Sequence, residues 1–171
     1  MRRISGVRSR LLCAAAFSVT CLLQSAGVSF ATTATTTFTV QVVLTATCVI
    51  NSASTLNFGT QGVLQANVDQ TSTIAVQCTD TTPYDIGLDA GTGSGASVAT
   101  RKMTSGGATV NYRLYSDAGR STVWGNTVST DTVSAVGTGA AQSYTVYGRV
   151  PPQTTPAPGT YTDTVTVTVT Y

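Results

Sequence analysis

Residues 161–171 read YTDTVTVTVTY and alternate valine with threonine up to the last residue of the chain. Successive side chains of an extended chain point to opposite faces, so Val165, Val167, Val169 and Tyr171 share one face and the threonines share the other. Valine and threonine are β-branched and favour strands over helices. The stretch is therefore predicted to be a strand with one buried face.

The same period of two recurs along the chain between clusters of turn residues. Apolar side chains alternate in residues 38–44, 74–78, 84–88, 110–115 and 144–148. Stretches rich in glycine and aspartate, such as 91–95 and 117–119, separate several of these segments. Several short strands at this spacing predict an all-β fold, an antiparallel β-sandwich in one domain.

The first 31 residues have the pattern of a secretory signal peptide. Arginines at positions 2, 3, 8 and 10 precede the apolar run 11–23, and Ser29 and Ala31 fit an A-x-A-like cleavage site. The apolar run is too short for a membrane-spanning helix, so no membrane anchor is expected after cleavage. We expect the protein to be exported.

The composition excludes several kinds of function. The chain has no histidine, which rules out Ser-His-Asp catalysis and imidazole-ligated metals. After residue 31, five Lys or Arg residues face seven Asp residues, and this net charge of −2 disfavours nucleic acid as a partner. The sequence offers no nucleophile–base pair, so we expect no enzyme and no cofactor.

Two cysteines, Cys48 and Cys78, remain after the signal peptide. In an exported protein such a pair predicts a structural disulfide, and the C-x-x-C spacing of redox and metal sites is absent. Asp80, Asp85 and Asp89 lack the dense ligand spacing of a calcium loop and are expected to cap turns or to lie in solvated positions, so no metal site is predicted.

Three other features have a structural and a functional interpretation. Arg101 and Lys102 are expected on a solvated edge, because two basic residues are too few to bind a polyanion. Trp124 and the tyrosines of the alternating segments are expected mainly in the core, with a sugar-binding platform as the alternative. Asp163 is expected to position the turn into the last strand by hydrogen bonds.

Both ends of the predicted domain are unusual for a self-contained sandwich. The last strand runs to the final residue with no polar tail. Residues 34–44 form an equally regular apolar pattern just before Cys48. The simplest interpretation of that pattern, taken alone, is the first strand of the chain's own sandwich.

A series of motifs in fixed order adds a more specific interpretation. They are Cys48, Leu56-Asn57-Phe58-Gly59, residues 74–78 followed by Pro83-Tyr84, residues 87–91, Arg101-Lys102-Met103, residues 110–117, Trp124-Gly125, residues 147–151 and residues 159–165. In this order they resemble the spore coat protein U domain, a family that is similar to the subunits of archaic, Csu-type chaperone-usher pili. The resemblance covers residues 36–171.

The resemblance implies an incomplete immunoglobulin-like antiparallel β-sandwich that lacks its final strand. A periplasmic chaperone would hold the subunit until the N-terminal strand of the next subunit completes it. The donor strand would use Phe38, Val40, Val42 and Leu44, with the C-terminal strand (Val165, Val167, Val169, Tyr171) flanking the acceptor groove. The expected divisions are a signal peptide over 1–31, a donor-strand extension over 32–45 and a pilin domain over 46–171.

The implied function is a structural subunit, shaft or adaptor, of a secreted pilus that serves adhesion and biofilm formation. Its expected partners are identical or related pilus subunits, a periplasmic chaperone and an outer-membrane usher, and its location is the periplasm in transit and then the cell surface. The alternatives are a structural protein of a spore or outer coat and a monomeric secreted surface-binding module. A chaperone gene and an usher gene nearby would favour the pilus.

Overall fold

The computed structural model describes residues 29–171, so the predicted signal peptide lies outside it except for its last three residues. The chain divides into two units, one ending at Gln41 and one spanning Val42–Tyr171. In the first unit, residues 29–41 form no regular element and their side chains are exposed. The second unit contains all the strands.

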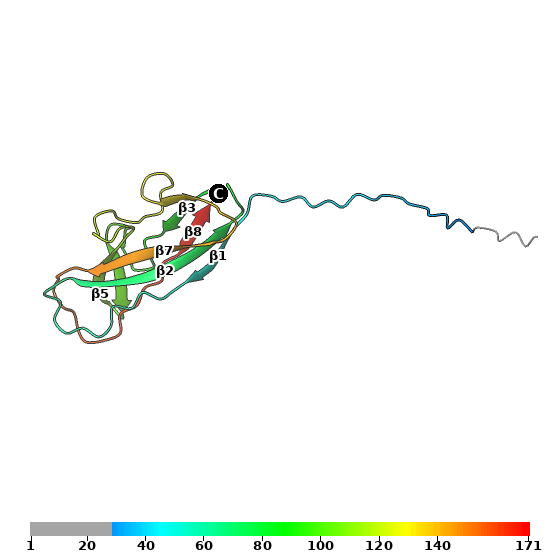
Figure 1. Cartoon of the computed structure of the whole chain (residues 1–171). Coiled ribbons are helices and arrows are strands. Elements are labelled where there is room, and N and C mark those ends of the chain that lie inside the picture. Colours follow the sequence, from blue (N-terminus) through cyan, green and yellow to red (C-terminus); the bar gives the residue numbers. More distant parts are fainter. Residues whose placement is uncertain (1–28) are drawn as a thin grey trace, which may run out of the picture. The chain divides into compact units, whose positions relative to one another are not determined.

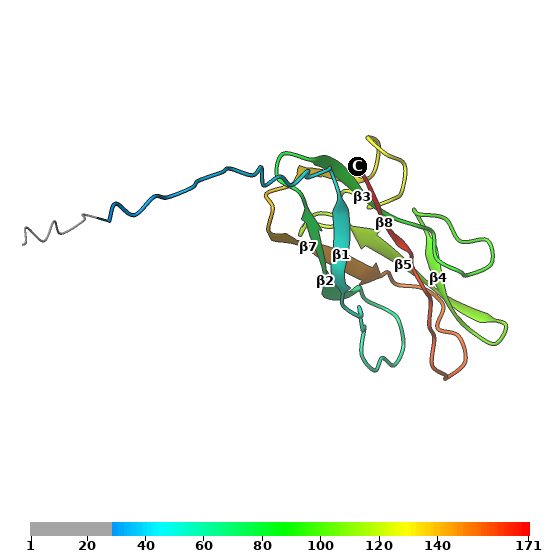
Figure 2. The same cartoon turned by 90° about the vertical axis from the view of Figure 1, so that its right-hand side faces the viewer.

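All regular elements in residues 29–171 are strands, and every pairing between them is antiparallel (Figures 1 and 2). The strands are β1 (Cys48–Ala53), β2 (Val68–Cys78), β3 (Pro83–Leu88), β4 (Arg101–Ser105), β5 (Ala108–Tyr115), β6 (Val133–Val136), β7 (Ala141–Val150) and β8 (Val167–Thr170). One sheet has the order β1-β2-β7-β5-β4 and the other the order β6-β3-β8. The predicted all-β antiparallel fold is confirmed.

The period-two alternation builds the core between these sheets. In β2 the side chains of Ile74, Val76 and Cys78 are buried while the residues between them are partly exposed. Residues Ile86 and Leu88 of β3, from the other sheet, join the same core cluster. The cluster also contains Trp124, Tyr84 and Tyr112, and Tyr144 packs against it. Tyr115 is buried as well.

A disulfide between Cys48 and Cys78 joins β1 to β2, where the two residues lie opposite each other in the ladder. The predicted bond is therefore present. It closes a loop with a sequence separation of 30 residues, which stabilises the fold by about 3 to 4 kcal/mol in the chain-entropy model. The edge strand β1 is thus covalently fixed to its neighbour in the sheet, β2.

The terminal strand is shorter than its alternation predicts. Val167 to Thr170 pair with β3, and upstream of them Thr162 makes an isolated bridge to Thr104 of β4. Between these contacts, residues 163–166 have no ladder partner, because β3 ends at Leu88. The segment therefore passes from the edge of one sheet to the edge of the other while keeping its valines inward and its threonines outward.

Arg101 contradicts its predicted place on a solvated edge, because its side chain is 0% exposed. The guanidinium donates hydrogen bonds to the carbonyls of Leu88, Asp89, Val98 and Trp124, at 2.7 to 3.0 Å. Two of these acceptors, the carbonyls of Leu88 and Asp89, lie at the end of β3, where no neighbouring strand donates to them. Carbonyl acceptors thus replace water around a charge that would otherwise be costly to bury.

Candidate functional site

Two sheet edges lie close together on one side of the core. The strand β1 is the edge of the five-stranded sheet, and β8 is the edge of the three-stranded sheet. Within the described residues each is paired along one side only. The two strands are in contact with each other, and Figure 2 shows them on the same side of the domain. The sandwich is therefore open along this side.

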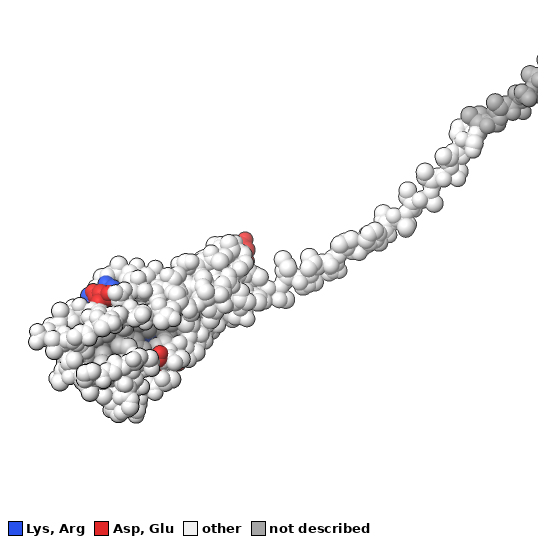
Figure 3. All heavy atoms as spheres, turned by 90° about the horizontal axis from the view of Figure 1, so that it is seen from below, with Lys and Arg blue, Asp and Glu red and all other residues white. Residues whose placement is uncertain are grey.

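A groove of about 1220 Å³ reaches the core beside these two strands, and it touches β1 only at Ala53 and β8 only at Val167. Its floor is made of core side chains from both sheets, including Ile74, Leu88, Leu114 and Val146, and its walls are residues 53–64 and 155–165. Figure 3 shows a hollow and few charged side chains on the face that it presents. The groove therefore has a floor of apolar core side chains.

Every second residue of β8 turns its main-chain N–H and C=O groups toward the open side. Thr166 turns its main chain toward β3, because the amide of Asp89 donates to the Thr166 carbonyl at 3.1 Å and the Thr166 amide donates to Asp89 Oδ1 at 2.9 Å. Backbone groups of successive strand residues alternate in direction, so Val165, Val167 and Val169 turn their N–H and C=O groups toward the open edge. This edge can pair with one more strand.

The predicted donor residues all have highly exposed apolar side chains. The exposed fractions are 86% for Phe38, 83% for Val40, 79% for Val42 and 83% for Leu44. None of the residues 29–47 belongs to a strand.

The predicted flanking residues fall into two groups. Val165 and Val167 line the groove, and Val169 packs against the core cluster. Tyr171 lies beyond the end of β8, is 60% exposed and lines a separate hollow of about 270 Å³ with Asp85 and Ser134.

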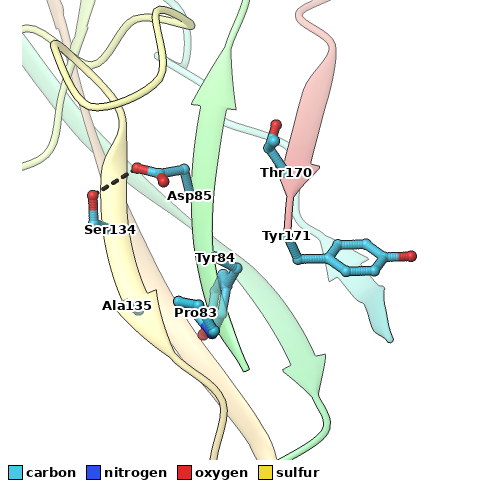
Figure 4. A pocket seen from close by; sticks show the side chains of 7 residues that line it. All are labelled: Pro83, Tyr84, Asp85, Ser134, Ala135, Thr170 and Tyr171. Carbon is cyan, nitrogen blue, oxygen red and sulfur yellow. Dashed lines mark hydrogen bonds between the residues drawn. The ribbon is translucent and has the colours of Figure 1, made fainter. Parts of the chain in front are cut away.

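In Figure 4 the ring of Tyr171 points away from the other residues of that hollow. The hydroxyls of Ser134 and Thr132 donate to the Asp85 carboxylate at 2.6 and 2.8 Å. These two hydrogen bonds hold the pKa of Asp85 below its usual value. The groove, which is lined by core side chains from both sheets, is the candidate site.

The groove walls were not predicted from the alternation. Leu56 and Phe58, from the segment after β1, pack over the core face of β7 at Gly148, where a Cβ atom would lie 2.7 Å from Leu56 and 3.0 Å from Phe58. The ring of Phe58 meets the edge of Tyr112 on the groove floor, with the ring centroids 6.3 Å apart. The available signal was Leu56-Asn57-Phe58-Gly59, one of the motifs on which the family resemblance rests.

Other kinds of site have little support in the part of the chain that the structure describes. No group of three or more His, Cys, Asp or Glu side chains there is placed to hold a metal ion. In the same residues no helix has the length and hydropathy needed to span a membrane. Asp80 and Asp89 accept hydrogen bonds from nearby backbone amides, as expected for residues that cap turns.

Comparisons with known proteins agree with this geometry. The family model of the Spore Coat Protein U domain matches residues 34–168. "Protein U" of Myxococcus xanthus is 36% identical over 139 residues, which cover 72% of this chain and 77% of that protein.

Among solved structures, one chain of a chaperone–tip adhesion subunit pre-assembly complex, CsuC-CsuE, from the archaic chaperone-usher Csu pili of Acinetobacter baumannii matches with a TM-score of 0.56 and 27% identity. The match covers 75% of this chain and 40% of that chain, so this chain spans less than half of the matched one. The similarity supports the predicted immunoglobulin-like pilus-subunit fold. On the family model and the curated relative together, this chain belongs to the Spore Coat Protein U domain family.

Proposed function

We propose that the chain is a structural subunit, shaft or adaptor, of a chaperone-usher fibre, and that residues 32–45 of one copy complete the sandwich of the next. The observation that supports this most directly is the combination of two features in one chain. A groove with an apolar floor lies open between the segment that follows β1 and the segment that precedes β8, and a regular apolar segment, 38–44, is exposed near the N-terminus. The groove lacks a strand with inward apolar side chains, and the segment 38–44 has such side chains but no core to bury them in.

The spacing and burial of the donor residues suit the groove. Side chains two residues apart in a strand are about 6.5 to 7 Å apart, so Phe38, Val40, Val42 and Leu44 would fill successive positions along about 20 Å. Burying these four side chains contributes roughly 6 to 12 kcal/mol of gross apolar stabilisation, before the cost of ordering the segment. Main-chain hydrogen bonds to the open edge of β8 add to this.

The donor segment is better suited to a neighbouring copy than to its own domain. Thr47 is fixed to Thr79, with the Thr79 amide donating to the Thr47 carbonyl at 2.9 Å. To pair beside its own β1, the segment ending at Leu44 would need a two-residue hairpin turn through Thr45 and Ala46. Such turns require positive φ and favour Gly, Asn or Asp, which Thr and Ala do not replace.

This pairing leads to a fibre. Each copy donates at its N-terminal segment and accepts at its groove, so the contact joins two different surfaces and does not close on itself. An open groove with an unpaired edge also favours aggregation until it is filled. We therefore infer that a periplasmic chaperone covers the groove first and that an outer-membrane usher exports the subunit to the cell surface, for adhesion and biofilm formation.

Co-expression tests the proposal. The mature chain is produced in the periplasm with and without the chaperone encoded beside its gene. We expect a soluble one-to-one complex with the chaperone, fibres visible by electron microscopy when the usher is added, and aggregation or degradation without the chaperone. Deletion of residues 32–44 should leave the chaperone complex intact and abolish fibres. A stable monomer without chaperone, independent of concentration, would contradict the proposal and favour a secreted binding module.

A further inference from the structure

The groove wall formed by residues 163–166 is held in an unusual way. Neighbouring residues pair with strands, Thr162 with Thr104 and Val167 with Leu88, but residues 163–166 lie between these two pairings. Val165 within this wall faces the groove. Something other than a ladder must therefore hold this part of the wall against the domain.

Asp163 supplies the first anchor. Its Oδ1 atom accepts hydrogen bonds from the amide and the hydroxyl of Thr92, at 2.8 and 2.9 Å, and from the amide of Thr164 at 2.8 Å. Its Oδ2 atom accepts from the hydroxyl of Tyr112 at 2.7 Å. The Asp163 carboxylate can approach this loop because the residue before Thr92 is Gly91. A Cβ atom at Gly91 would collide with the carboxylate. Asp163 thus ties the wall to the 89–92 loop and to the groove floor.

Asp89 supplies the second anchor. Its Oδ1 atom accepts from the amides of Thr166 and Gly91, both at 2.9 Å, and its own amide donates to the Thr166 carbonyl. Its carbonyl in turn accepts from Nε of the buried Arg101 at 2.7 Å. Partial burial acts to raise the pKa of Asp89, but the hydrogen bonds from Thr166 and Gly91 and the charge of Arg101 outweigh it and lower the pKa. The carboxylate is therefore charged at neutral pH.

We infer that Asp89 and Asp163 are positioning residues of the acceptor groove, which hold the wall 163–166 in place of strand pairing and so control how tightly one end of a donor strand is retained. The inference rests on the proposed function. An antiparallel donor on β8 runs with its C-terminal end toward the start of β8, so Val42 and Leu44 would lie beside this wall and Phe38 and Val40 beside β8 itself. The anchors should then affect Val42 and Leu44 selectively.

The test uses the full mature chain bound to its chaperone and an excess of fluorescent synthetic peptide 32–47. The variants are Asp163→Asn, which keeps the size of the side chain, and Asp85→Asn as a matched control, since Asp85 also accepts two hydroxyl hydrogen bonds but lies outside the groove. The release rate of bound peptide is measured by competition with unlabelled peptide. We expect Asp163→Asn to speed release about tenfold or more, and Asp85→Asn to change it little.

Two modified peptides make the test specific to the wall. One carries Thr in place of Val42 and Leu44, and the other carries Thr in place of Phe38 and Val40. The effect of Asp163→Asn should disappear with the first peptide and persist with the second. Equal effects on both peptides would overturn the inference, because they would indicate a general loss of stability.

Two further controls keep the outcomes separate. If Asp163→Asn yields no soluble complex, the variant Thr92→Val replaces it, because this change removes a single hydroxyl donor to Asp163. Thr92→Val should show the same selectivity between the two modified peptides, with a smaller increase in release rate. The absence of that selectivity would refute the inference. If the wild-type chain binds none of the peptides, the donor mechanism itself is refuted, and the inference falls with it. Wild-type binding with unchanged release from Asp163→Asn refutes the inference alone.

Discussion

Replacing Val42 with arginine in the donor segment should abolish fibre formation without unfolding the subunit. Val42 is 79% exposed in the free segment, so its side chain makes little contribution to the fold of its own domain. In a donor strand it would enter an apolar groove as one of four inward side chains. The same substitution at Val43, which is 73% exposed and lies on the opposite face of the extended segment, is the matched control.

The size of the effect follows from the groove lining. Loss of a buried valine removes about 1.5 kcal/mol or more, and a buried guanidinium without a partner costs several kcal/mol in addition. The nearest acidic lining residue, Asp163, already accepts four hydrogen bonds and is poorly placed to neutralise the new charge. A total of about 4 to 5 kcal/mol weakens binding about a thousandfold or more.

Peptide binding and fibre growth measure this effect. Labelled peptides 32–47 carrying Val42→Arg or Val43→Arg are added to the chaperone-bound wild-type chain, and their apparent Kd is obtained from fluorescence anisotropy. The Val43→Arg peptide should bind within about threefold of wild type, because its new side chain faces solvent. The full-length Val42→Arg chain should form the chaperone complex with its disulfide intact but give no fibres by electron microscopy.

Three results would refute the reasoning. Equal binding of both arginine peptides would show that the segment does not insert its alternate side chains. Loss of binding for Val43→Arg alone would show that the opposite face enters the groove. Loss of the chaperone-bound fold in full-length Val42→Arg would show that the segment belongs to its own domain.

Three other predictions follow from the structure. Native protein should show no free thiol at Cys48 or Cys78 before reduction, and Cys78→Ser should lower the free energy of unfolding by about 3 to 4 kcal/mol and reduce periplasmic yield. Gly91→Ala should destabilise the peptide-filled domain by about 1 to 3 kcal/mol in chemical denaturation, because φ is +78° there and the methyl group meets Asp163; an unchanged midpoint would show that the 89–92 loop adapts freely. The hydrogen bond from Arg149 lowers the pKa of Asp69, and the pKa of Asp89 is lowered as well. Both carboxylates therefore stabilise the folded state above about pH 4, and this stability should be lost as the pH falls further. A free energy of unfolding that stays level from about pH 5 to about pH 3 would contradict this.

The alternation of side chains was sufficient to predict the buried faces. Ile74, Val76 and Cys78 are buried as expected, since a period of two is a local property that survives whatever the strand packs against. The extent of the last strand was not predictable in this way. Residues 163–166 keep the alternation but have no ladder partner, because β3 ends at Leu88. The alternation within residues 163–166 carries no information about where another strand ends.

The buried position of Arg101 shows a different limit. A charged residue beside a lysine is expected in water, and nothing within a few residues of Arg101 indicates otherwise. The acceptors that hold it come from Leu88, Asp89 and Trp124, up to 23 residues away in sequence. Only the fold brings these carbonyls together, so the motif Arg101-Lys102-Met103 could be recognised as a family feature but not explained from the sequence.

The open groove also links the stability of the subunit to its assembly. Core side chains such as Ile74 and Leu88 line the groove, so a bound donor strand would complete the packing of the same core that holds the domain together. A ligand that binds only the folded state stabilises it by RT ln(1 + [L]/Kd), which is about 2.7 kcal/mol at one hundred times the Kd. The unfolding midpoint should therefore rise with the concentration of peptide 32–47. It should not rise with the Val42→Arg peptide at the same concentrations, and a midpoint that is independent of wild-type peptide would mean that the core is already complete without a donor.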